Sequence, residues 1–292
     1  MPMRGLEQAV TQIQTIAIVG AGQMGQGIAQ TASAAGYRVL LADVEHRRAV
    51  AGKEALAKVL QRLVDKGKLA NDDKAQLLAR ISPVGGLDEL GGAEMVIEAV
   101  SEVAAVKKKV FQELDRACAP GVILASNTSS LGIGTLGRVT GRPELVVGMH
   151  FMNPVPLMKL VEGIRGERTA DVTLQVVRQV AESMGKVFVE SQDSPGFIVN
   201  RILLPMINEA FRALEQGVAS AEDIDEGMRL GTHQPMGPLR LADLIGLDTC
   251  CAILEVMAEG LATDKYQPVA LLKRYVEEGR LGKKVGLGVY GY

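Results

Sequence analysis

The feature that most constrains the fold is a glycine-rich turn between a strand-like run and a helix-like run. The apolar run Thr15–Val19 precedes the turn, and Ile28–Ala35 follows it. In this context the first glycine permits a tight turn, the second lets backbone approach a pyrophosphate, and the third allows the helix to pack on the strand. The free N–H groups at the start of the helix favour the same anion. We therefore expect the following residues to bind a dinucleotide: Gly20, Gly22, Gln23, Met24 and Gly25.

A carboxylate at the end of the next strand-like run indicates which dinucleotide is bound. Asp43 directly follows the run Tyr37–Ala42 and lies 18 residues after Gly25. At that position it can accept hydrogen bonds from both ribose hydroxyls, and it would repel a 2′-phosphate. This predicts NAD rather than NADP as the cofactor, although the neighbouring Arg47 and Arg48 leave NADP open.

The remaining pattern divides the chain into two domains. Up to about residue 193, short apolar runs alternate with helical stretches, which predicts a parallel sheet covered on both faces, with a helical excursion at about residues 47–80. Beyond Asp193 there are no convincing strands, and Pro205 predicts a kink or a break in the first helix. The helix-like segments there are about 197–216, 221–230, 239–261 and 268–280. The predicted fold is an α/β Rossmann-like dinucleotide-binding domain, residues 1–193, followed by an all-α domain, residues 194–292.

The composition argues against nucleic-acid binding, membrane insertion and a metal centre. The formal charge is −2, and aromatic residues make up 3% with no Trp, so neither a basic surface nor a base-stacking platform is expected. No apolar stretch approaches the ~20 residues needed to span a bilayer. Met1–Gln14 resembles neither a secretory signal nor a transit peptide. Cys118, Cys250 and Cys251 lack metal-ligand spacing and are expected to be free thiols, so we expect a cytoplasmic protein without a bound metal.

A histidine and a glutamate twelve residues apart are the best candidates for acid–base chemistry. His150 lies near the end of the strand-like run Leu145–Phe151, and Glu162 lies in the run Met158–Ile164. Asn-Pro-Val-Pro between the runs is typical of a turn, so the second run can fold back and bring the carboxylate to the imidazole. A histidine held in one tautomer by a carboxylate can act as a general base near neutral pH. Taken alone, the pair fits a purely structural hydrogen bond equally well.

A run of hydroxyl and amide side chains, Ser126-Asn-Thr-Ser-Ser130, follows the strand-like run Val122–Ala125. Open α/β sheets bind ligands at the carboxyl ends of their strands. Ser, Thr and Asn are also good helix caps. The sequence supports a ligand-binding run and a helix-capping run equally.

Five segments carry a family resemblance. They are Gly20–Gly27, Ser126–Ser130, His150–Pro156, Met158–Glu162 and Asp193–Arg201. In this order and spacing they resemble the 3-hydroxyacyl-CoA dehydrogenase family, and the chain length is similar to that of its short-chain or 3-hydroxybutyryl-CoA branch. Three further segments extend the resemblance to nearly the whole chain: Pro235–Pro238, Gly246–Asp248 and Gly282–Tyr290.

The resemblance implies a role for each matching position. His150 would be the catalytic base and Glu162 its orienting partner. Ser129 and Asn200 would hydrogen-bond the C3 oxygen of the substrate. Because Asn200 belongs to the predicted helical domain and His150 to the α/β domain, we expect the reacting centre in an interdomain cleft. The implied cofactor-binding positions outside the glycine-rich turn are Asp43, Glu102, Lys107 and Asn127.

The implied activity is the reversible, NAD-dependent oxidation of an (S)-3-hydroxyacyl-CoA to a 3-ketoacyl-CoA. Residues that would contact CoA are not assigned, because Val59 stands where some members have a Ser that contacts it. The resemblance also implies a homodimer through the helical domain, where the apolar segments Ile202–Met206 and Ile245–Met257 exceed the needs of one small bundle. Two alternatives are a dehydrogenase of a free 3-hydroxy acid or sugar acid, and a non-catalytic NAD-binding structural or sensor protein.

Overall fold

The structure, a computed structural model, describes residues 13–292. The described residues divide into two compact units, with the boundary between Ser194 and Pro195. The prediction made for Met1–Gln14 falls almost entirely outside the described residues. Across the part of the chain that is described, no helix is long and apolar enough to cross a membrane.

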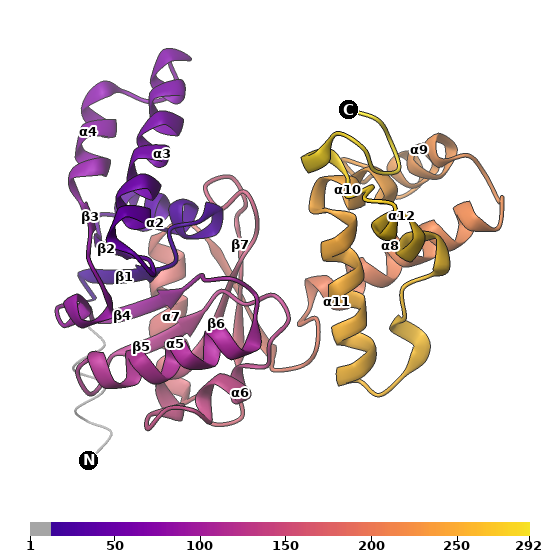
Figure 1. The fold of residues 1–292 in the computed structure, drawn as a ribbon. Coiled ribbons are helices and arrows are strands. Elements are labelled where there is room, and N and C mark those ends of the chain that lie inside the picture. Colours follow the sequence, from indigo (N-terminus) through magenta and orange to yellow (C-terminus); the bar gives the residue numbers. More distant parts are fainter. Residues whose placement is uncertain (1–12) are drawn as a thin grey trace. The chain divides into compact units, whose positions relative to one another are not determined.

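The first unit is built on one sheet whose strands lie in the order β3-β2-β1-β4-β5-β6-β7-β8 (Figure 1). Every neighbouring pair is parallel except β6 and β7, which are antiparallel. Since β1 lies between β2 and β4, the strand order reverses there, and the crevice at the carboxyl ends is the usual ligand position. The strands are β1 (Thr15–Val19), β2 (Arg38–Ala42), β3 (Ile81–Pro83), β4 (Met95–Glu98), β5 (Ile123–Ser126), β6 (Val146–Phe151), β7 (Leu160–Arg165) and β8 (Val187–Gln192).

The two edge strands, β3 and β8, are not predicted by the sequence pattern. β3 has three residues and ends at Pro83. β8 exposes Val187 and Val189 along the free edge of the sheet. Short or half-exposed edge strands lack the continuous apolar run that marks a buried strand.

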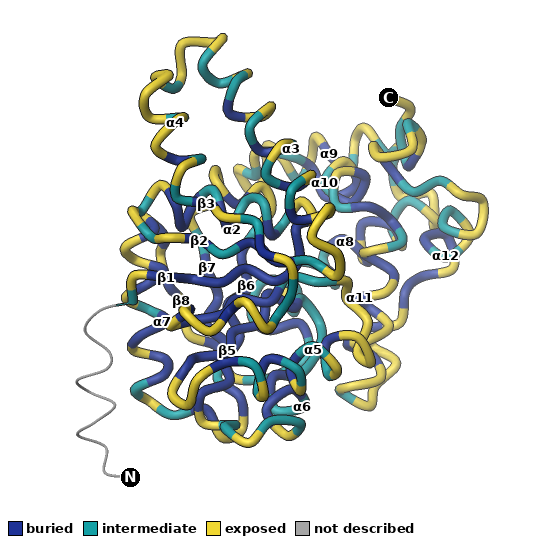
Figure 2. Tube along the Cα trace, turned by 60° about the vertical axis from the view of Figure 1, so that its left-hand side comes forward, coloured by how far each residue is buried: buried dark blue, intermediate teal, exposed yellow. Residues whose placement is uncertain are grey.

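Helices cover both faces of the sheet, as the alternating pattern predicts, with α5 on one side and α7 on the other (Figure 1). Strands β1, β4 and β6 are buried along their whole length and form the centre of this unit. The buried course of β1 and β6 is dark blue in Figure 2. The helical excursion expected at about residues 47–80 is the pair α3 and α4. The helices are α2 (Gln23–Ala34), α3 (His46–Asp65), α4 (Asn71–Ala79), α5 (Ala104–Ala117), α6 (Ile133–Gly137) and α7 (Asp171–Ser183), with 3-10 turns η1 (Leu87–Leu90) and η2 (Pro143–Leu145).

The second unit is built of helices around a core of its own. Its helices are α8 (Val199–Glu215), α9 (Ala221–Gly231), α10 (Pro238–Ile245), α11 (Leu247–Gly260) and α12 (Ala270–Glu277), with η3 (Asp264–Tyr266) and η4 (Lys283–Val285). α8 continues through Pro205, so the predicted break does not occur. The single helix predicted for 239–261 is wrong: Gly246 has φ of 106°, outside the helical region, and separates α10 from α11. The apolar side chains from Leu247 to Met257 are mostly buried within this unit and are not in surplus.

A buried carboxylate anchors the C-terminal segment to the core of the second unit. Asp243 in α10 is 1% exposed. Its Oδ1 accepts from the Val289 N–H at 2.8 Å, and its Oδ2 accepts from the Tyr290 N–H at 2.9 Å and the Tyr292 hydroxyl at 3.1 Å. Burial, together with the charge of Asp243, raises the pKa of Tyr292 to about 12, so the hydroxyl remains a donor at neutral pH. One side chain therefore fixes three donors of the last four residues.

Replacing Asp243 by Ala should destabilise the protein by about 2–4 kcal/mol, because two amides and a hydroxyl lose their acceptor. Urea unfolding followed by circular dichroism should show a lower midpoint. The control is Glu259→Ala, which removes an exposed carboxylate from α11 and should leave the midpoint unchanged. Equal midpoints for Asp243→Ala and the unaltered protein would show that Asp243 is not an anchor.

Candidate active site

Two of the three key positions in the glycine-rich turn after β1 require glycine. Gly20 has φ of 109°, and a Cβ there would lie 2.5 Å from the Ala99 carbonyl oxygen. A Cβ on Gly25 would lie 1.7 Å from the Gly20 carbonyl oxygen, so α2 could not pack as closely on the turn. Gly22 has no atom within 4 Å of such a Cβ. Its backbone therefore faces open space that a phosphate group can approach.

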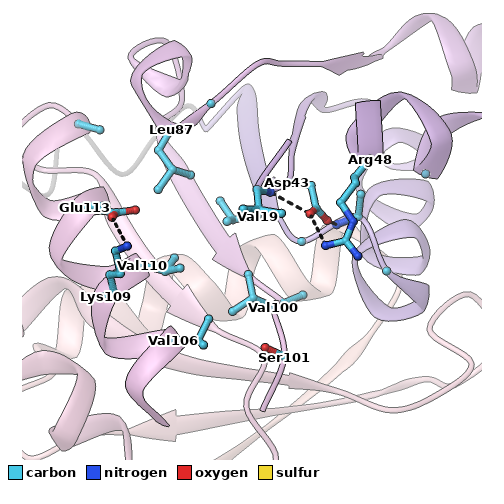
Figure 3. A pocket seen from close by; sticks show the side chains of 18 of the residues that line it. Val19, Asp43, Arg48, Leu87, Val100, Ser101, Val106, Lys109, Val110 and Glu113 are labelled. Carbon is cyan, nitrogen blue, oxygen red and sulfur yellow. Dashed lines mark hydrogen bonds and ion pairs between the residues drawn. The ribbon is translucent and has the colours of Figure 1, made fainter. Parts of the chain in front are cut away.

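A cavity of about 1240 Å³ lies beside this turn (Figure 3). It extends from Asp43 and Arg48 to Val100 and Ser101, which follow β4. Its volume exceeds the roughly 300–1,000 Å³ of most small-molecule pockets, so it is large enough for a dinucleotide. Of the predicted cofactor-binding residues, three line this cavity: Gly20, Gly22 and Asp43. The others are not among its lining residues: Gln23, Met24, Gly25, Glu102, Lys107 and Asn127.

Asp43 connects the end of β2 to the glycine-rich turn. Its Oδ2 accepts from the Ala21 N–H at 2.8 Å, and its Oδ1 accepts from the Val44 N–H at 2.8 Å. Arg48 Nη1 lies 3.7 Å from Oδ1. The carboxylate thus fixes the turn in addition to lining the cavity, a contact that sequence spacing alone did not indicate.

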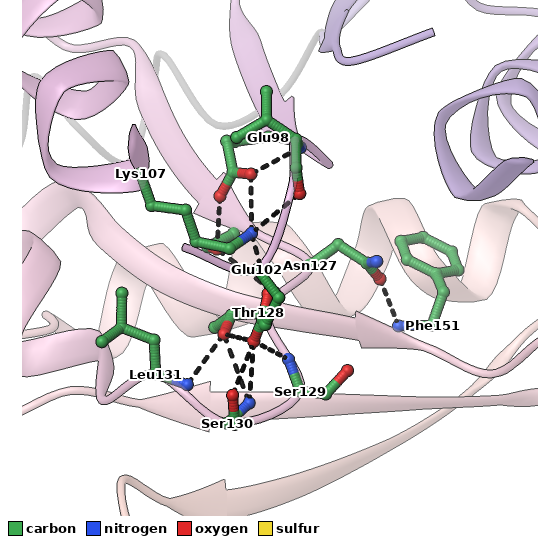
Figure 4. A network of polar contacts seen from close by, with 11 residues as sticks. Glu98, Glu102, Lys107, Asn127, Thr128, Ser129, Ser130, Leu131 and Phe151 are labelled. Carbon is green, nitrogen blue, oxygen red and sulfur yellow. Dashed lines mark hydrogen bonds and ion pairs between the residues drawn. The ribbon is translucent and has the colours of Figure 1, made fainter. Parts of the chain in front are cut away.

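The hydroxyl run after β5 is held by the carboxylate of Glu102 (Figure 4). Glu102 Oε1 accepts hydrogen bonds from Thr128 Oγ1, the Ser129 N–H (2.9 Å), the Ser130 N–H (3.0 Å) and Ser130 Oγ (2.9 Å). Burial alone would raise the pKa of Glu102, but the charge of Lys107 and hydrogen bonds from Thr128, Lys107 and Ser130 lower this pKa below its usual value. Four donors to one oxygen therefore fix the backbone that carries Ser129.

This arrangement tests one of the two interpretations of the hydroxyl run, the capping of a helix. The next helix, α6, begins at Ile133, and its N-cap, Gly132, provides no side-chain cap. Thr128 Oγ1 accepts from the Leu131 N–H at 2.9 Å, before the helix begins. The hydroxyls fix the loop and do not cap α6, so the helix-capping interpretation is wrong.

A second carboxylate lies behind the first, and sequence reasoning missed its role. Glu98 ends β4 and is 0% exposed. Its Oε1 accepts from Lys107 Nζ (2.8 Å) and the Val100 N–H (2.7 Å), and its Oε2 accepts from Ser126 Oγ (2.6 Å). Lys107 Nζ also lies 3.1 Å from Glu102 Oε2 (Figure 4). The available signal was a carboxylate at the end of an otherwise apolar strand.

Strands β6 and β7 bring His150 and Glu162 into contact, as the sequence predicts. The two residues are directly opposite in the antiparallel register, so their side chains lie on one face of the sheet. His150 Nδ1 donates to Glu162 Oε2 at 2.7 Å, and both side chains are buried. This bond selects the tautomer in which the Nε2 lone pair is the basic site of the ring.

The turn between β6 and β7 is fixed by Lys186, which nothing in the sequence distinguishes from a surface lysine. Its Nζ donates to the carbonyl oxygens of Val155 (2.5 Å) and Met158 (2.8 Å), and burial lowers the pKa of this ammonium group. Gln23 Nε2 donates to Asn153 Oδ1 at 3.2 Å. The hairpin that carries His150 is thus joined to the start of α2.

The two asparagines predicted to belong to the site, Asn127 and Asn200, have different structural environments. Asn127 Oδ1 accepts from the Phe151 N–H at 2.8 Å and ties the end of β5 to the end of β6. Asn200 lies in the first turn of α8, in the second unit, and is half-buried.

Within residues 13–292, no group of three or more His, Cys, Asp or Glu side chains could hold a metal ion. The three cysteines are buried free thiols.

Known proteins are similar to this chain in sequence and in fold over nearly their whole length. A probable 3-hydroxybutyryl-CoA dehydrogenase of Bacillus subtilis (strain 168) is 53% identical over 281 residues, which cover 96% of this chain and 98% of the relative. A 3-hydroxybutyryl-CoA dehydrogenase of Bradyrhizobium diazoefficiens is 49% identical, covering 96% of each chain. The crystal structure of (S)-3-hydroxybutyryl-CoA dehydrogenase from Ralstonia eutropha superposes with a TM-score of 0.93 at 47% identity, covering 96% of this chain and 99% of that one.

Family models match both units. The 3-hydroxyacyl-CoA dehydrogenase NAD binding domain matches residues 15–194, and the 3-hydroxyacyl-CoA dehydrogenase C-terminal domain matches residues 196–292. Because these matches span both units and include the glycine-rich turn and the His150–Glu162 hairpin, the chain belongs to the 3-hydroxyacyl-CoA dehydrogenase family.

Proposed function

We propose that this chain catalyses the reversible, NAD-dependent oxidation of a short-chain (S)-3-hydroxyacyl-CoA, such as 3-hydroxybutyryl-CoA, to the 3-ketoacyl-CoA. The observation that carries this proposal is the buried hydrogen bond from His150 Nδ1 to Glu162 Oε2. Because β1, β4, β5 and β6 are mutually parallel neighbours, His150 lies at the same edge of the sheet as the glycine-rich turn. The family and the names of the 53% and 49% identical relatives support the CoA thioester and the four-carbon acyl group.

His150 is the proton acceptor in this proposal. Its Nε2 takes the proton of the C3 hydroxyl, and Glu162 stabilises the imidazolium that forms. In the reverse direction the imidazolium returns the proton to the C3 oxygen. A bound NAD would supply the acceptor for the hydride that leaves C3.

Ser129 and Asn200 are the proposed partners of the C3 oxygen. The Ser129 backbone is held by Glu102, which limits the positions that the Ser129 hydroxyl can take. A polar group that is fixed before substrate binds stabilises developing charge without a cost of reorganisation. Asn200 is proposed to donate its side-chain amide to the same oxygen.

The cofactor is proposed to bind along the 1240 Å³ cavity, with its pyrophosphate at the open backbone of Gly22 and a ribose at Asp43. Glu102 and Asn127 are proposed to border the nicotinamide half. Lys107, at 1% exposed, would act through its two carboxylate partners rather than by direct contact.

A homodimer formed through the second unit and a cytoplasmic location complete the proposal. The dimer is supported by large apolar side chains that this single chain leaves exposed on α8 and α10, namely Ile202 at 68% and Leu244 at 54%. The cytoplasmic location is supported by three free cysteines without a disulfide among residues 13–292.

A rate series against 3-ketoacyl-CoA substrates tests the activity and its chain-length range. Consumption of NADH should give the highest kcat/KM with acetoacetyl-CoA and lower values as the acyl chain lengthens. Free acetoacetate should react at least about 100-fold more slowly, because binding energy from the CoA portion is lost. Equal rates with free acetoacetate would favour a dehydrogenase of free hydroxy acids. No oxidation of NADH with any thioester would favour a non-catalytic protein.

Replacing His150 by Gln should lower kcat about 100-fold or more, because the general base is removed. Affinity for NADH, measured by fluorescence titration, should stay within about twofold, since His150 is not a cofactor ligand in this proposal. His233→Gln makes the same chemical change on the exposed loop after α9 and should leave kcat unaltered. Near-normal turnover of His150→Gln would remove His150 from the mechanism.

Replacing Asp43 by Asn should lower the ratio of kcat/KM for NAD to kcat/KM for NADP by about tenfold or more, because the charge that repels a 2′-phosphate is lost. Asn can keep one acceptor for the Ala21 N–H. The matched control, Asp88→Asn, changes a carboxylate on η1 that lines the same cavity and should keep the ratio. An unchanged ratio in Asp43→Asn would show that Asp43 does not select the cofactor.

A further inference from the structure

We propose that the cluster of Glu98, Lys107 and Glu102, here called the charge triad, shifts the relative affinity of the cofactor site toward the oxidised cofactor and away from the reduced one. The nicotinamide ring is cationic when oxidised and neutral when reduced. A net negative charge beside the ring therefore stabilises the oxidised form selectively. This inference rests on the proposed function, since it takes NAD as the cofactor.

The charge triad has a formal net charge of −1, from two carboxylates and one ammonium group. Glu98 is 0% and Lys107 1% exposed, so solvent screens these two charges poorly, whereas the Glu102 side chain is 39% exposed and its charge is partly screened. Among residues 13–292, no second cation forms an ion pair with either carboxylate. The other partners of these carboxylates are neutral N–H and hydroxyl groups, which stabilise the negative charge without cancelling it.

The sheet topology assigns the nicotinamide half to the side of the charge triad. Asp43, the proposed ribose partner, ends β2, on one side of β1. The glycine-rich turn at the end of β1 would hold the pyrophosphate. A dinucleotide that starts at β2 and crosses β1 must continue over the ends of β4 and β5, where Glu98 and the Glu102-bound loop lie.

The proposed contacts to the substrate also assign the nicotinamide half to the side of the charge triad. Ser129, the proposed partner of the C3 oxygen, has its N–H 2.9 Å from Glu102 Oε1. Nicotinamide C4 must approach C3 of the substrate for hydride transfer. A nicotinamide ring that exchanges hydride with C3 would therefore be held near the loop that Glu102 fixes. For scale, one unit charge at a separation of about 7–8 Å from a cationic ring, at an effective dielectric constant of about 20–40, would change the affinity ratio of the two redox forms roughly five- to fiftyfold.

A purely structural role for the charge triad predicts a different result. If these residues only hold the Ser129 loop, their replacement weakens binding of both redox forms by the same factor. The ratio of the two dissociation constants is then unchanged. That ratio, measured without turnover, separates the electrostatic role from the structural one.

The experiment measures Kd for NAD⁺ by calorimetry and Kd for NADH by fluorescence titration, at pH 8, in three variants. Glu102→Gln brings the formal net charge of the charge triad to zero and should lower the preference for NAD⁺, the ratio of Kd for NADH to Kd for NAD⁺, about fivefold or more. Lys107→Met brings the formal net charge to −2 and should raise this ratio. Glu182→Gln is the matched control: it makes the same change at an exposed carboxylate on α7 that does not line the cofactor cavity, so its ratio should stay within about twofold.

A ratio in Glu102→Gln within about twofold of the unaltered protein overturns the proposal, as does a ratio that does not rise in Lys107→Met. Either result leaves the proposed function intact. Failure of the unaltered protein to bind NAD⁺ and NADH would instead refute the proposed function.

Discussion

The hydrogen bond between His150 and Glu162 depends on the one antiparallel pairing in the sheet. A parallel partner for β6 would need a crossover of a dozen or more residues and would not place the two side chains opposite each other. The antiparallel register makes them neighbours on one face, and a slip of one residue would turn Glu162 to the opposite face. Lys186 opposes such a slip by holding two carbonyl groups of the connecting turn. The 2.7 Å hydrogen bond between His150 and Glu162 thus depends on the direction of the two strands and on the turn that connects them.

Carboxylates at the ends of parallel strands organise the rest of this edge. Asp43 after β2 and Glu98 at the end of β4 each accept a backbone N–H from a loop that borders the cavity. Glu102 does the same for the loop that carries Ser129. Backbone held in this way does not have to be ordered when a ligand arrives, so less binding energy is lost to reorganisation. The acidic side chains shape the site even where they do not line it.

The features that could be predicted from the sequence are those carried by residues close together in the chain. The glycine-rich turn, Asp43 and the His150–Glu162 hairpin are encoded in short stretches whose spacing has few physical explanations. Lys186 and Glu98 were missed because their roles depend on burial against segments far away in sequence. The break at Gly246 was missed because apolar periodicity continues across it, and only the φ of 106° shows that the helix ends. The edge strands were missed because a strand with one free side needs no continuous apolar run.

Stability alone does not account for the charge triad. A buried ion pair such as that of Lys107 with Glu98 is often no better for stability than apolar side chains of similar volume. Asp243 shows the structural use of a buried carboxylate in the same chain: it binds two backbone amides and a hydroxyl, and no cation lies among its hydrogen-bond partners. Glu98 and Glu102 share one lysine and retain a negative charge at the edge of the sheet where the cofactor is proposed to bind. An arrangement that keeps this excess charge has its clearest physical use where the ligand itself becomes positive.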